Sequence, residues 1–242
     1  MSLHKDEAVV LRRLDYSETS QVLAFFTRSN GQIRLIAKGI KRGTKKAFAV
    51  GIDLLEAGTV VFARAEGRGG LGTLTEWQQG ETFLGLRLDV RCLYAGQYAA
   101  EVTAALTEEG DPHPELYDAL IDLLRSLAAG GDPVAQAARF QMQLLTSIGL
   151  VPILDVCAAC HQAQRDGDLE WFSAGQGGMI CRDCEPSVVE KRRVAPGIAS
   201  ALLRGELPAS LAADAFEILN YGISYAMGRP SRLAPYVAGE RG

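Results

Sequence analysis

The chain contains 242 residues, of which 48% are hydrophobic, and has a formal net charge of −4. This length and composition indicate a folded, soluble protein with one large domain or two to three small ones. No run of eighteen apolar residues occurs, and the N-terminal residues lack the apolar core and the cleavage site of a signal peptide. These observations argue against a membrane or secreted protein, and we expect a cytoplasmic location.

The charge is divided unevenly along the chain. Residues 1 to 80 contain twelve lysines and arginines against eight aspartates and glutamates, a net charge of +4. The remaining 162 residues contain thirteen against twenty-one, a net charge of −8. No acid lies between Thr19 and Ile52, and this window holds seven of the basic residues. It therefore predicts a positive potential that attracts a phosphate backbone.

The first eighty residues favour β structure. Short apolar runs rich in β-branched residues are separated by turn signals, among them Asn30-Gly31, which is typical of a hairpin. The run that follows alternates, so Arg34 and Lys38 are expected on the same face. Five or six strands in about eighty residues predict a small closed barrel over residues 1–80. The expected strands are residues 8–14, 21–27, 32–38, 52–57, 59–66 and 71–77.

From residue 81 onward the apolar spacing becomes helical. Residues 83–106 form one such stretch, a leucine stripe marks a second helix, and Asp132-Pro133 begins a third that ends at Gly149. Two more helical stretches are expected at 198–203 and 211–227, and the lone Cys92 is expected in a helix core. The pattern predicts a helical domain over residues 81–242, interrupted by a cysteine-rich insert at 157–184. The leucine stripe comprises Leu116, Leu120, Leu123, Leu124 and Leu127.

Four of the five cysteines form two CxxC pairs, with twenty residues between the pairs. Two such turns present four thiolates toward one point, which suits a tetrahedral Zn²⁺ ion. The segment between them predicts a small hairpin of residues 169–173 and 178–180, and the metal would replace a hydrophobic core. Four thiolates leave no open position, so one structural zinc per chain is expected. The expected ligands are Cys157, Cys160, Cys181 and Cys184.

Two other interpretations of the cysteines are less consistent with the sequence. A structural disulfide is unusual in the cytoplasm, and a thioredoxin-like redox site uses one CxxC pair. His161 adjoins Cys160 and could compete as a ligand, although a surface histidine is the simpler interpretation.

No catalytic constellation is visible. None of the three histidines stands beside a serine or cysteine as a general base would, so a non-enzymatic protein is expected. Residues 67–72 match the glycine pattern of a dinucleotide site, but β structure rather than a helix is expected after them. A hairpin turn explains the pattern better, and Arg68 could still contact DNA from it.

The basic window leaves two interpretations open, a solvated loop or a nucleic-acid site. Because it follows a strand with Arg34 and Lys38 on one face, we interpret it as part of a DNA-binding surface. The candidate DNA-binding residues are Arg34, Lys38, Lys41, Arg42, Lys45, Lys46 and Arg68. Phe25 and Phe26 are adjacent in a strand, so one fills the barrel, and the other packs on the helical domain or stacks on bases. Tyr16 and Phe48 carry the same ambiguity.

The order of several motifs resembles the bacterial recombination mediator family RecO. These motifs are residues 7–11 (EAVVL), 16–20 (YSETS), Phe26-Thr27 with Gly31, 37–42 (AKGIKR), and 144–152 (LLTSIGLVP) followed directly by the four-cysteine insert. The resemblance covers most of the chain. It implies an α+β multidomain protein with an N-terminal OB-fold, a helical domain and a zinc-ribbon-like module.

The resemblance also implies a function in recombinational DNA repair. Family members bind single-stranded and double-stranded DNA, anneal complementary strands, and bind the acidic C-terminal tail of single-strand DNA-binding protein. With RecR they help load RecA, and they have no catalytic residues to carry over. The expected location is therefore cytoplasmic, at the nucleoid. The acidic C-terminal two-thirds of this chain makes the tail site hard to place, with Arg91, Arg125 and Arg139 as candidates.

Two other function classes stay open from the residues alone. An RNA-binding or transcription-associated protein would share the barrel and the metal but prefer RNA or bind polymerase. A zinc-dependent nuclease or nucleotide-cofactor enzyme fits less well, because four thiolates leave the metal no open position for water or substrate.

Overall fold

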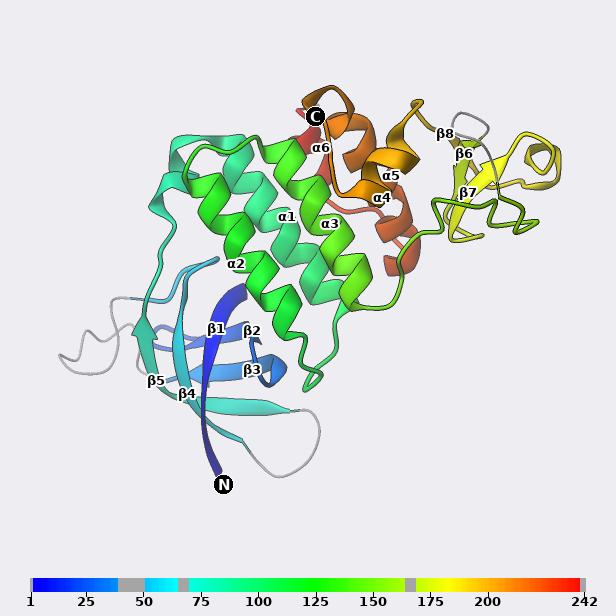
Figure 1. The fold of residues 1–242 in the computed structure, drawn as a ribbon. Coiled ribbons are helices and arrows are strands. Elements are labelled where there is room, and N and C mark those ends of the chain that lie inside the picture. The colour runs from blue at the N-terminus through cyan, green and yellow to red at the C-terminus, as the bar shows by residue number, and fades with distance from the viewer. Residues whose placement is uncertain (1, 39–50, 65–69, 164–168, 240–242) are drawn as a thin grey trace. The chain divides into compact units, whose positions relative to one another are not determined.

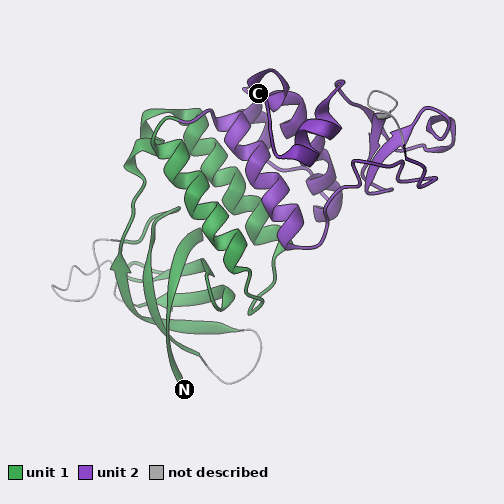
Figure 2. Cartoon of the chain, in the orientation of Figure 1, with its two compact units in different colours: residues 1–130 green, residues 131–242 purple. Residues whose placement is uncertain are grey.

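A computed structural model describes residues 2–38, 51–64, 70–163 and 169–239 (Figure 1). The chain forms two compact units, residues 1–130 and residues 131–242 (Figure 2). The first two helices thus belong to the same unit as the barrel. The division into domains at residue 80 stays a prediction. Within the described ranges, no helix is both long enough and apolar enough to cross a lipid bilayer.

Five strands form a closed barrel in the first unit. They are β1 (Ser2–Asp15), β2 (Gln21–Thr27), β3 (Gly31–Ala37), β4 (Ala57–Arg64) and β5 (Leu71–Gln79). Their order is β1-β2-β3-β5-β4, and β4 pairs back onto β1. The β3 and β5 strands are parallel, whereas the other neighbours are antiparallel. This is an OB-like barrel, as the sequence predicted.

The barrel interior is filled by alternate residues of every strand. Twelve buried apolar side chains form this core, and Phe25 and Trp77 are the largest aromatic pair, with ring centroids 5.3 Å apart. The β2–β3 hairpin turns at Asn30-Gly31, as predicted. Gly31 has φ +63°, and a Cβ there would lie 2.2 Å from the carbonyl oxygen of Asp111, so only glycine fits.

The prediction of a strand at residues 52–57 is wrong. Only Ala57 belongs to a strand, because the chain turns before it and Leu55 adopts a left-handed φ of +66°. The apolar character of this segment reflects core packing instead, since Ile52 is part of the barrel core. The segment is fixed by the hydrogen bonds from Val10 N to the carbonyl of Glu56 and from Leu55 N to the carbonyl of Val10, both 3.0 Å.

The predicted helical stretch of residues 83–106 begins as a 3₁₀ helix, η2 (Leu84–Leu88), and continues as α1 (Val90–Leu106). Asp89 separates the two because its extended backbone ends η2 and its carboxylate caps α1 by accepting from Arg91 N. Cys92 is buried in α1, as predicted. The helix α2 (Pro114–Ala128) buries all five residues of the predicted leucine stripe.

The second unit contains α3 (Pro133–Ser147), α4 (Ile198–Arg204), η4 (Ala209–Leu211), α5 (Ala212–Met227) and α6 (Ala234–Ala238). The carboxylate of Asp132 accepts from Ala135 N at 2.7 Å and caps α3, as its position before the proline predicted. The helices α3 and α5 pack against each other, and α5 ends at Gly228, where φ is +68°.

A small sheet completes the second unit. The predicted hairpin is confirmed as β6 (Leu169–Ser173) and β7 (Gly178–Cys181), and a third strand, β8 (Arg192–Arg193), pairs with β6. A short η3 helix (Glu185–Ser187) follows the last cysteine. We call residues 153–193 the cysteine module.

Candidate metal centre and nucleic-acid interface

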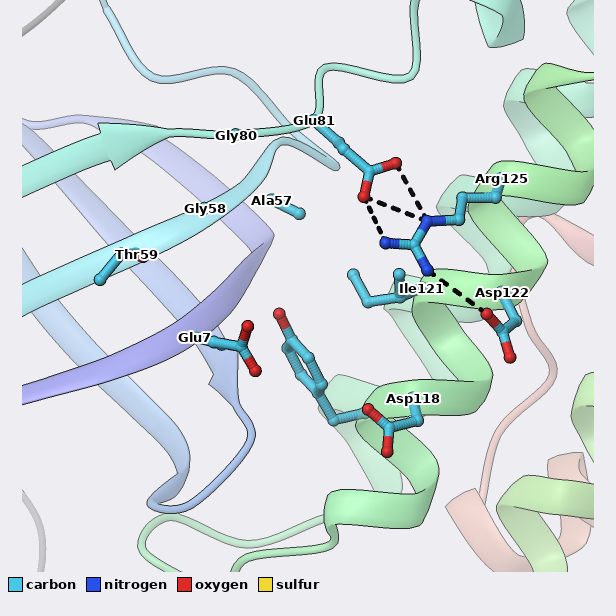
Figure 3. A pocket seen from close by; sticks show the side chains of 11 residues that line it. Glu7, Ala57, Gly58, Thr59, Gly80, Glu81, Asp118, Ile121, Asp122 and Arg125 are labelled. Carbon is cyan, nitrogen blue, oxygen red and sulfur yellow. Dashed lines mark hydrogen bonds and ion pairs between the residues drawn. The ribbon is translucent and has the colours of Figure 1, made fainter.

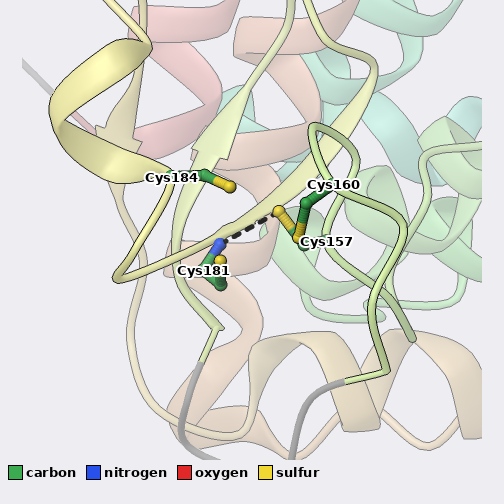
Figure 4. A group of neighbouring side chains, drawn as sticks. All are labelled: Cys157, Cys160, Cys181 and Cys184. Carbon is green, nitrogen blue, oxygen red and sulfur yellow. Dashed lines mark hydrogen bonds between the residues drawn. The ribbon is translucent and has the colours of Figure 1, made fainter.

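The four predicted cysteines converge in the cysteine module (Figure 4). Their sulfur atoms all lie within 4.8 Å of one another. Four sulfurs bound at 2.3 Å to a tetrahedral Zn²⁺ are about 3.8 Å apart, so this cluster has the size that a metal ion requires. The cluster can therefore hold a metal ion. Within the described residues, His161 is not part of it and lies exposed on the turn after Cys160.

The ionisation of these cysteines shows why a cation suits the cluster. Burial opposes ionisation of Cys157, but amide donors, foremost that of Cys181, outweigh it and lower the pKa of Cys157 to about 6. The hydrogen bonds that Cys184 shares with Cys181 and Cys160 raise the pKa of Cys184 to about 12. Four neighbouring sulfurs cannot all become thiolates by themselves, and a dication removes that repulsion.

Main-chain contacts hold the two cysteine turns together. Cys181 N donates to the Cys157 sulfur at 3.4 Å (Figure 4). Ala158 N donates to the carbonyl of Met179 at 2.7 Å. In the described residues, the hydrophobic cluster that includes Cys157 and Cys181 has five buried members, and Ile153 and Trp171 pack against it. Two of the ligand candidates are thus part of this small cluster.

The exterior of the barrel has an open part, which we call the open barrel face. Residues paired across neighbouring strands point to the same side of a sheet. Two rows form the face, one of Arg12, Ala24, Arg34 and Leu71, and one of Leu14, Val22, Ile36 and Thr73. Cations thus stand on β1 and β3, and the side chains around them are apolar or small. Strands 2 and 3 form the nucleic-acid face of many OB-folds.

The next row of the exterior is covered by helices. It consists of Val9, Phe26 and Gln32, of which Val9 and Phe26 are fully buried. The Phe26 ring packs on Tyr117 of α2 with centroids 6.4 Å apart, and Gln32 Nε2 donates to the carbonyl of Thr107 at 2.7 Å. Helix packing therefore covers this row and leaves the open barrel face accessible on β2 and β3.

These contacts decide the predicted roles of the aromatic residues. Phe25 fills the barrel and Phe26 packs on α2, and both are fully buried, so neither presents a ring to a base. Tyr16 is 68% exposed in the loop between β1 and β2, so its ring is accessible. Phe48 lies outside the described residues.

Arg34 and Lys38 are exposed, as the alternation predicted. Arg34 forms an ion pair with Glu109, whose other oxygen lies 3.8 Å from Arg64 Nη2. Lys38 follows the end of β3 and forms no ion pair with the described residues. The other candidate cations, Lys41, Arg42, Lys45, Lys46 and Arg68, lie outside the described residues. The glycine pattern at 67–72 leads directly into β5, which excludes the helix that a dinucleotide site needs.

Arg12 is a candidate that sequence reasoning missed. Its place on the open barrel face depends on a β-bulge between Val10 and Arg12, which pairs Arg12 with Ala24. In a regular strand Arg12 would share the side of Val10, two residues earlier, which points into the barrel core. The adjacent basic residues Arg12 and Arg13 were the sequence signal that could have indicated this site. The two have different roles in the structure, since Arg13 forms an ion pair with Asp53 at 2.8 Å.

Two family models match this chain. Residues 1–83 match "Recombination protein O N terminal" and residues 87–219 match "Recombination protein O C terminal". The DNA repair protein RecO of Listeria monocytogenes serotype 4a is 32% identical over 182 residues, which are 75% of this chain and 69% of that protein. RecO of Anaeromyxobacter dehalogenans is 34% identical over 206 residues, 84% of this chain and 79% of that protein. The chain therefore belongs to the RecO family of DNA repair proteins.

Proposed function

We propose that this protein is a non-enzymatic recombination mediator that binds single-stranded and double-stranded DNA and anneals complementary strands. With RecR it would help load RecA onto DNA coated by single-strand DNA-binding protein, in the cytoplasm at the nucleoid. The observation that carries this proposal is the open barrel face, where cations flank apolar residues on an OB-like barrel. Its place in a family of DNA repair proteins favours DNA over RNA as the ligand.

The mechanism is charge neutralisation. Phosphates would lie along Arg12, Arg34 and Lys38 and continue onto the basic segment of Lys41, Arg42, Lys45 and Lys46. These cations carry no base-specific geometry, so affinity should not depend on sequence. Reduced repulsion between two strands would then allow complementary bases to pair.

The cysteine module would hold one structural Zn²⁺ through Cys157, Cys160, Cys181 and Cys184. Four thiolates fill a tetrahedral site and leave no position for water, so the metal would brace the fold rather than act in catalysis.

A fluorescence anisotropy titration with single-stranded DNA tests the proposed DNA site. Replacing Lys41, Arg42, Lys45 and Lys46 by glutamate should reduce the slope of log K against log salt by about 0.7 for each phosphate that the variant no longer neutralises. The matched control compares Lys45→Glu/Lys46→Glu with Arg182→Glu/Arg204→Glu, two exposed arginines of the other unit. Equal losses of affinity in the two double variants would contradict the site.

A strand-annealing assay tests the function itself. Complementary strands, bare or coated with single-strand DNA-binding protein, should anneal faster with the intact protein than with the four-residue variant. The zinc content and thermal midpoint of that variant must match those of the intact protein. Preference for an RNA strand over a DNA strand of equal length would favour the RNA-binding alternative instead.

Among the three arginines considered for the acidic tail of single-strand DNA-binding protein, Arg91 has the most suitable surroundings. It follows Leu88 and Val90, which are 91% and 58% exposed, so a peptide bound there could contact a cation and apolar side chains together. We expect Arg91→Glu to weaken a labelled tail peptide more than Arg139→Glu does. Equal affinities for the two variants would exclude Arg91.

A further inference from the structure

An acidic pocket lies in the first unit, between the barrel and α2 (Figure 3). It has a volume of about 560 Å³, within the range of about 300–1,000 Å³ typical of pockets that bind small groups. Glu7 of β1 and the small residues Ala57 and Gly58 of β4 form one side. The other side is formed by α2 residues between Tyr117 and Arg125, and Glu81 lies beside Arg125.

The charge of this pocket is strongly unbalanced. Four carboxylates line it, of Glu7, Glu81, Asp118 and Asp122, against the single guanidinium of Arg125. Arg125 Nε lies 3.1 Å from both Glu81 oxygens, and its Nη1 lies 3.6 Å from Asp122 (Figure 3). On the other side, Arg28 holds Asp118 at 2.8 Å and lies 3.9 Å from Glu7, so Glu7 has the longest ion pair of the four carboxylates. A nucleic acid would be repelled here, so the pocket is distinct from the open barrel face.

Glu7 is the carboxylate best placed to accept a ligand. Its side chain is 63% exposed, and its nearest cation in the described residues, Arg28 Nη1, lies at 3.9 Å. Arg28 is itself held by Asp118, with 2.8 Å between Nη2 and Oδ2. Glu7 is therefore fixed in position by its strand but only weakly neutralised.

Tyr117 supplies a second, independent feature of the pocket. Only 6% of the residue is exposed, and it lines the pocket, where its hydroxyl forms no hydrogen bond with a described residue. The hydroxyl oxygen is not one of the fully buried polar atoms without a partner, so it opens onto the pocket, where a ligand can reach it. Burial and the neighbouring carboxylates of Glu7, Asp6 and Asp118 raise the pKa of Tyr117, so the phenol stays neutral and its oxygen can accept from a donor.

We propose that the acidic pocket binds the guanidinium group of an arginine side chain on a partner protein. A guanidinium carries five donors in a plane, so it can donate to the Glu7 carboxylate and the Tyr117 oxygen at the same time. An ammonium is a more strongly hydrated point charge, so it should bind more weakly here. A side chain from a partner brings no carboxylate into the pocket, unlike free arginine. This proposal does not depend on the DNA-binding function.

Chemical-shift mapping on the full chain tests the proposal with three blocked pentapeptides, acetyl-Gly-Gly-X-Gly-Gly-amide. X is arginine, lysine or citrulline, the uncharged analogue of arginine. The arginine peptide should shift the amides of Gly58, Tyr117 and Ile121, and the lysine peptide should bind more weakly. The citrulline peptide should bind at least about fivefold more weakly, the loss expected for one ion pair of about 1 kcal/mol.

Matched variants identify the binding groups. Glu7→Gln and Tyr117→Phe should each weaken the arginine peptide about threefold to fivefold, because each loses one acceptor. Glu76→Gln makes the same charge change on the exposed side of β5, outside the pocket, and should have less than a twofold effect. Unchanged amide spectra away from the pocket would show that the variants fold.

Three outcomes would overturn the proposal. Equal binding of the arginine and citrulline peptides would show that no ion pair forms. Tighter binding of free L-arginine than of the peptide would indicate a small-molecule site. Displacement of the peptide by low concentrations of Mg²⁺, with shifts at the same amides, would indicate a cation site instead.

Discussion

The barrel and the cysteine module are both small sheets, but they are stabilised by different means. The barrel closes on itself around twelve buried apolar residues, so every strand shares one core. The described part of the module has three short strands, and its hydrophobic cluster around the cysteine turns has five buried members there, of which Cys157 and Cys181 also belong to the sulfur cluster. The barrel can rely on the hydrophobic effect of one shared core, whereas under the proposed function a bound metal would supplement the smaller core of the module.

The two tryptophans allow both regions to be followed in one molecule. Trp77 is 5% exposed in the barrel core, and Trp171 packs against the small cluster of the module. Each indole N–H gives a separate NMR signal, so loss of one region can be distinguished from loss of the other.

Metal removal should have the largest effect and should be confined to the module. Structural Zn²⁺ contributes about 10–16 kcal/mol of apparent binding energy in small zinc domains. Chelation, or Cys181→Ser, should therefore shift and broaden the Trp171 signal while the Trp77 signal stays unchanged. Cys92→Ser serves as the control, since Cys92 lies in α1 of the other unit and is not one of the four clustered cysteines. An unchanged Trp171 signal after complete chelation would contradict the comparison.

Phe25→Ala should affect the opposite region. Phe25 is fully buried against Trp77, and removing a core phenylalanine costs about 3–5 kcal/mol through lost burial and the cavity left behind. Urea unfolding monitored at Trp77 should shift to a lower midpoint, and the Trp171 signal should keep its position in the native state. A shift of both signals at the same urea concentration would show that the regions unfold together.

Glu190→Gln should have an intermediate, local effect on the module. The Glu190 carboxylate accepts from Ser173 Oγ and Gly175 N, both at 2.8 Å, and from Ala174 N at 3.3 Å, so it holds the turn between β6 and β7. Weakening these charge-assisted hydrogen bonds should cost roughly 2 kcal/mol. Hydrogen exchange should accelerate at Gly175 but not at Leu35 in the barrel. Unaltered exchange at Gly175 would show that the metal alone fixes the turn.

The smallest effect concerns pH and two glutamates with opposite shifts. Burial raises the pKa of Glu56, so ionised Glu56 weakens the fold above its raised pKa, and the penalty disappears below the unfolded value of about 4.3. Glu56→Gln should therefore raise the thermal midpoint at pH 7 but not at pH 3.5. The hydrogen bond from Arg125 lowers the pKa of Glu81, so its stabilisation is present above the unfolded pKa and is lost as pH falls.

Glu81→Gln is the matched comparison, and it should lower the midpoint at pH 7. This difference should shrink as the solution is acidified through the lowered pKa of Glu81. Midpoints measured by calorimetry between pH 3.5 and pH 7 give both curves, and curves of the same sign would contradict the assignment.

The sequence by itself determined the features that arise from local spacing. Alternation along β2 and β3 specified the barrel interior, because neighbouring residues of a strand point to opposite sides. The leucine stripe specified the buried face of α2, since its spacing matches the helical turn. The spacing of the two CxxC pairs likewise specified a cluster of four sulfurs, because each short turn aims two thiols at one point.

Only the tertiary structure decided which separate segments meet. A bulge in β1 pairs Arg12 with Ala24 and so brings Arg12 onto the same face as Arg34. The left-handed backbone of Leu55 makes residues 52–56 a turn that packs on the barrel core rather than a strand. The acidic pocket joins Glu7 of β1 to Tyr117 of α2, which are distant in the sequence. Spacing along the chain carries no information about such pairs, because register and helix packing are set by the whole core.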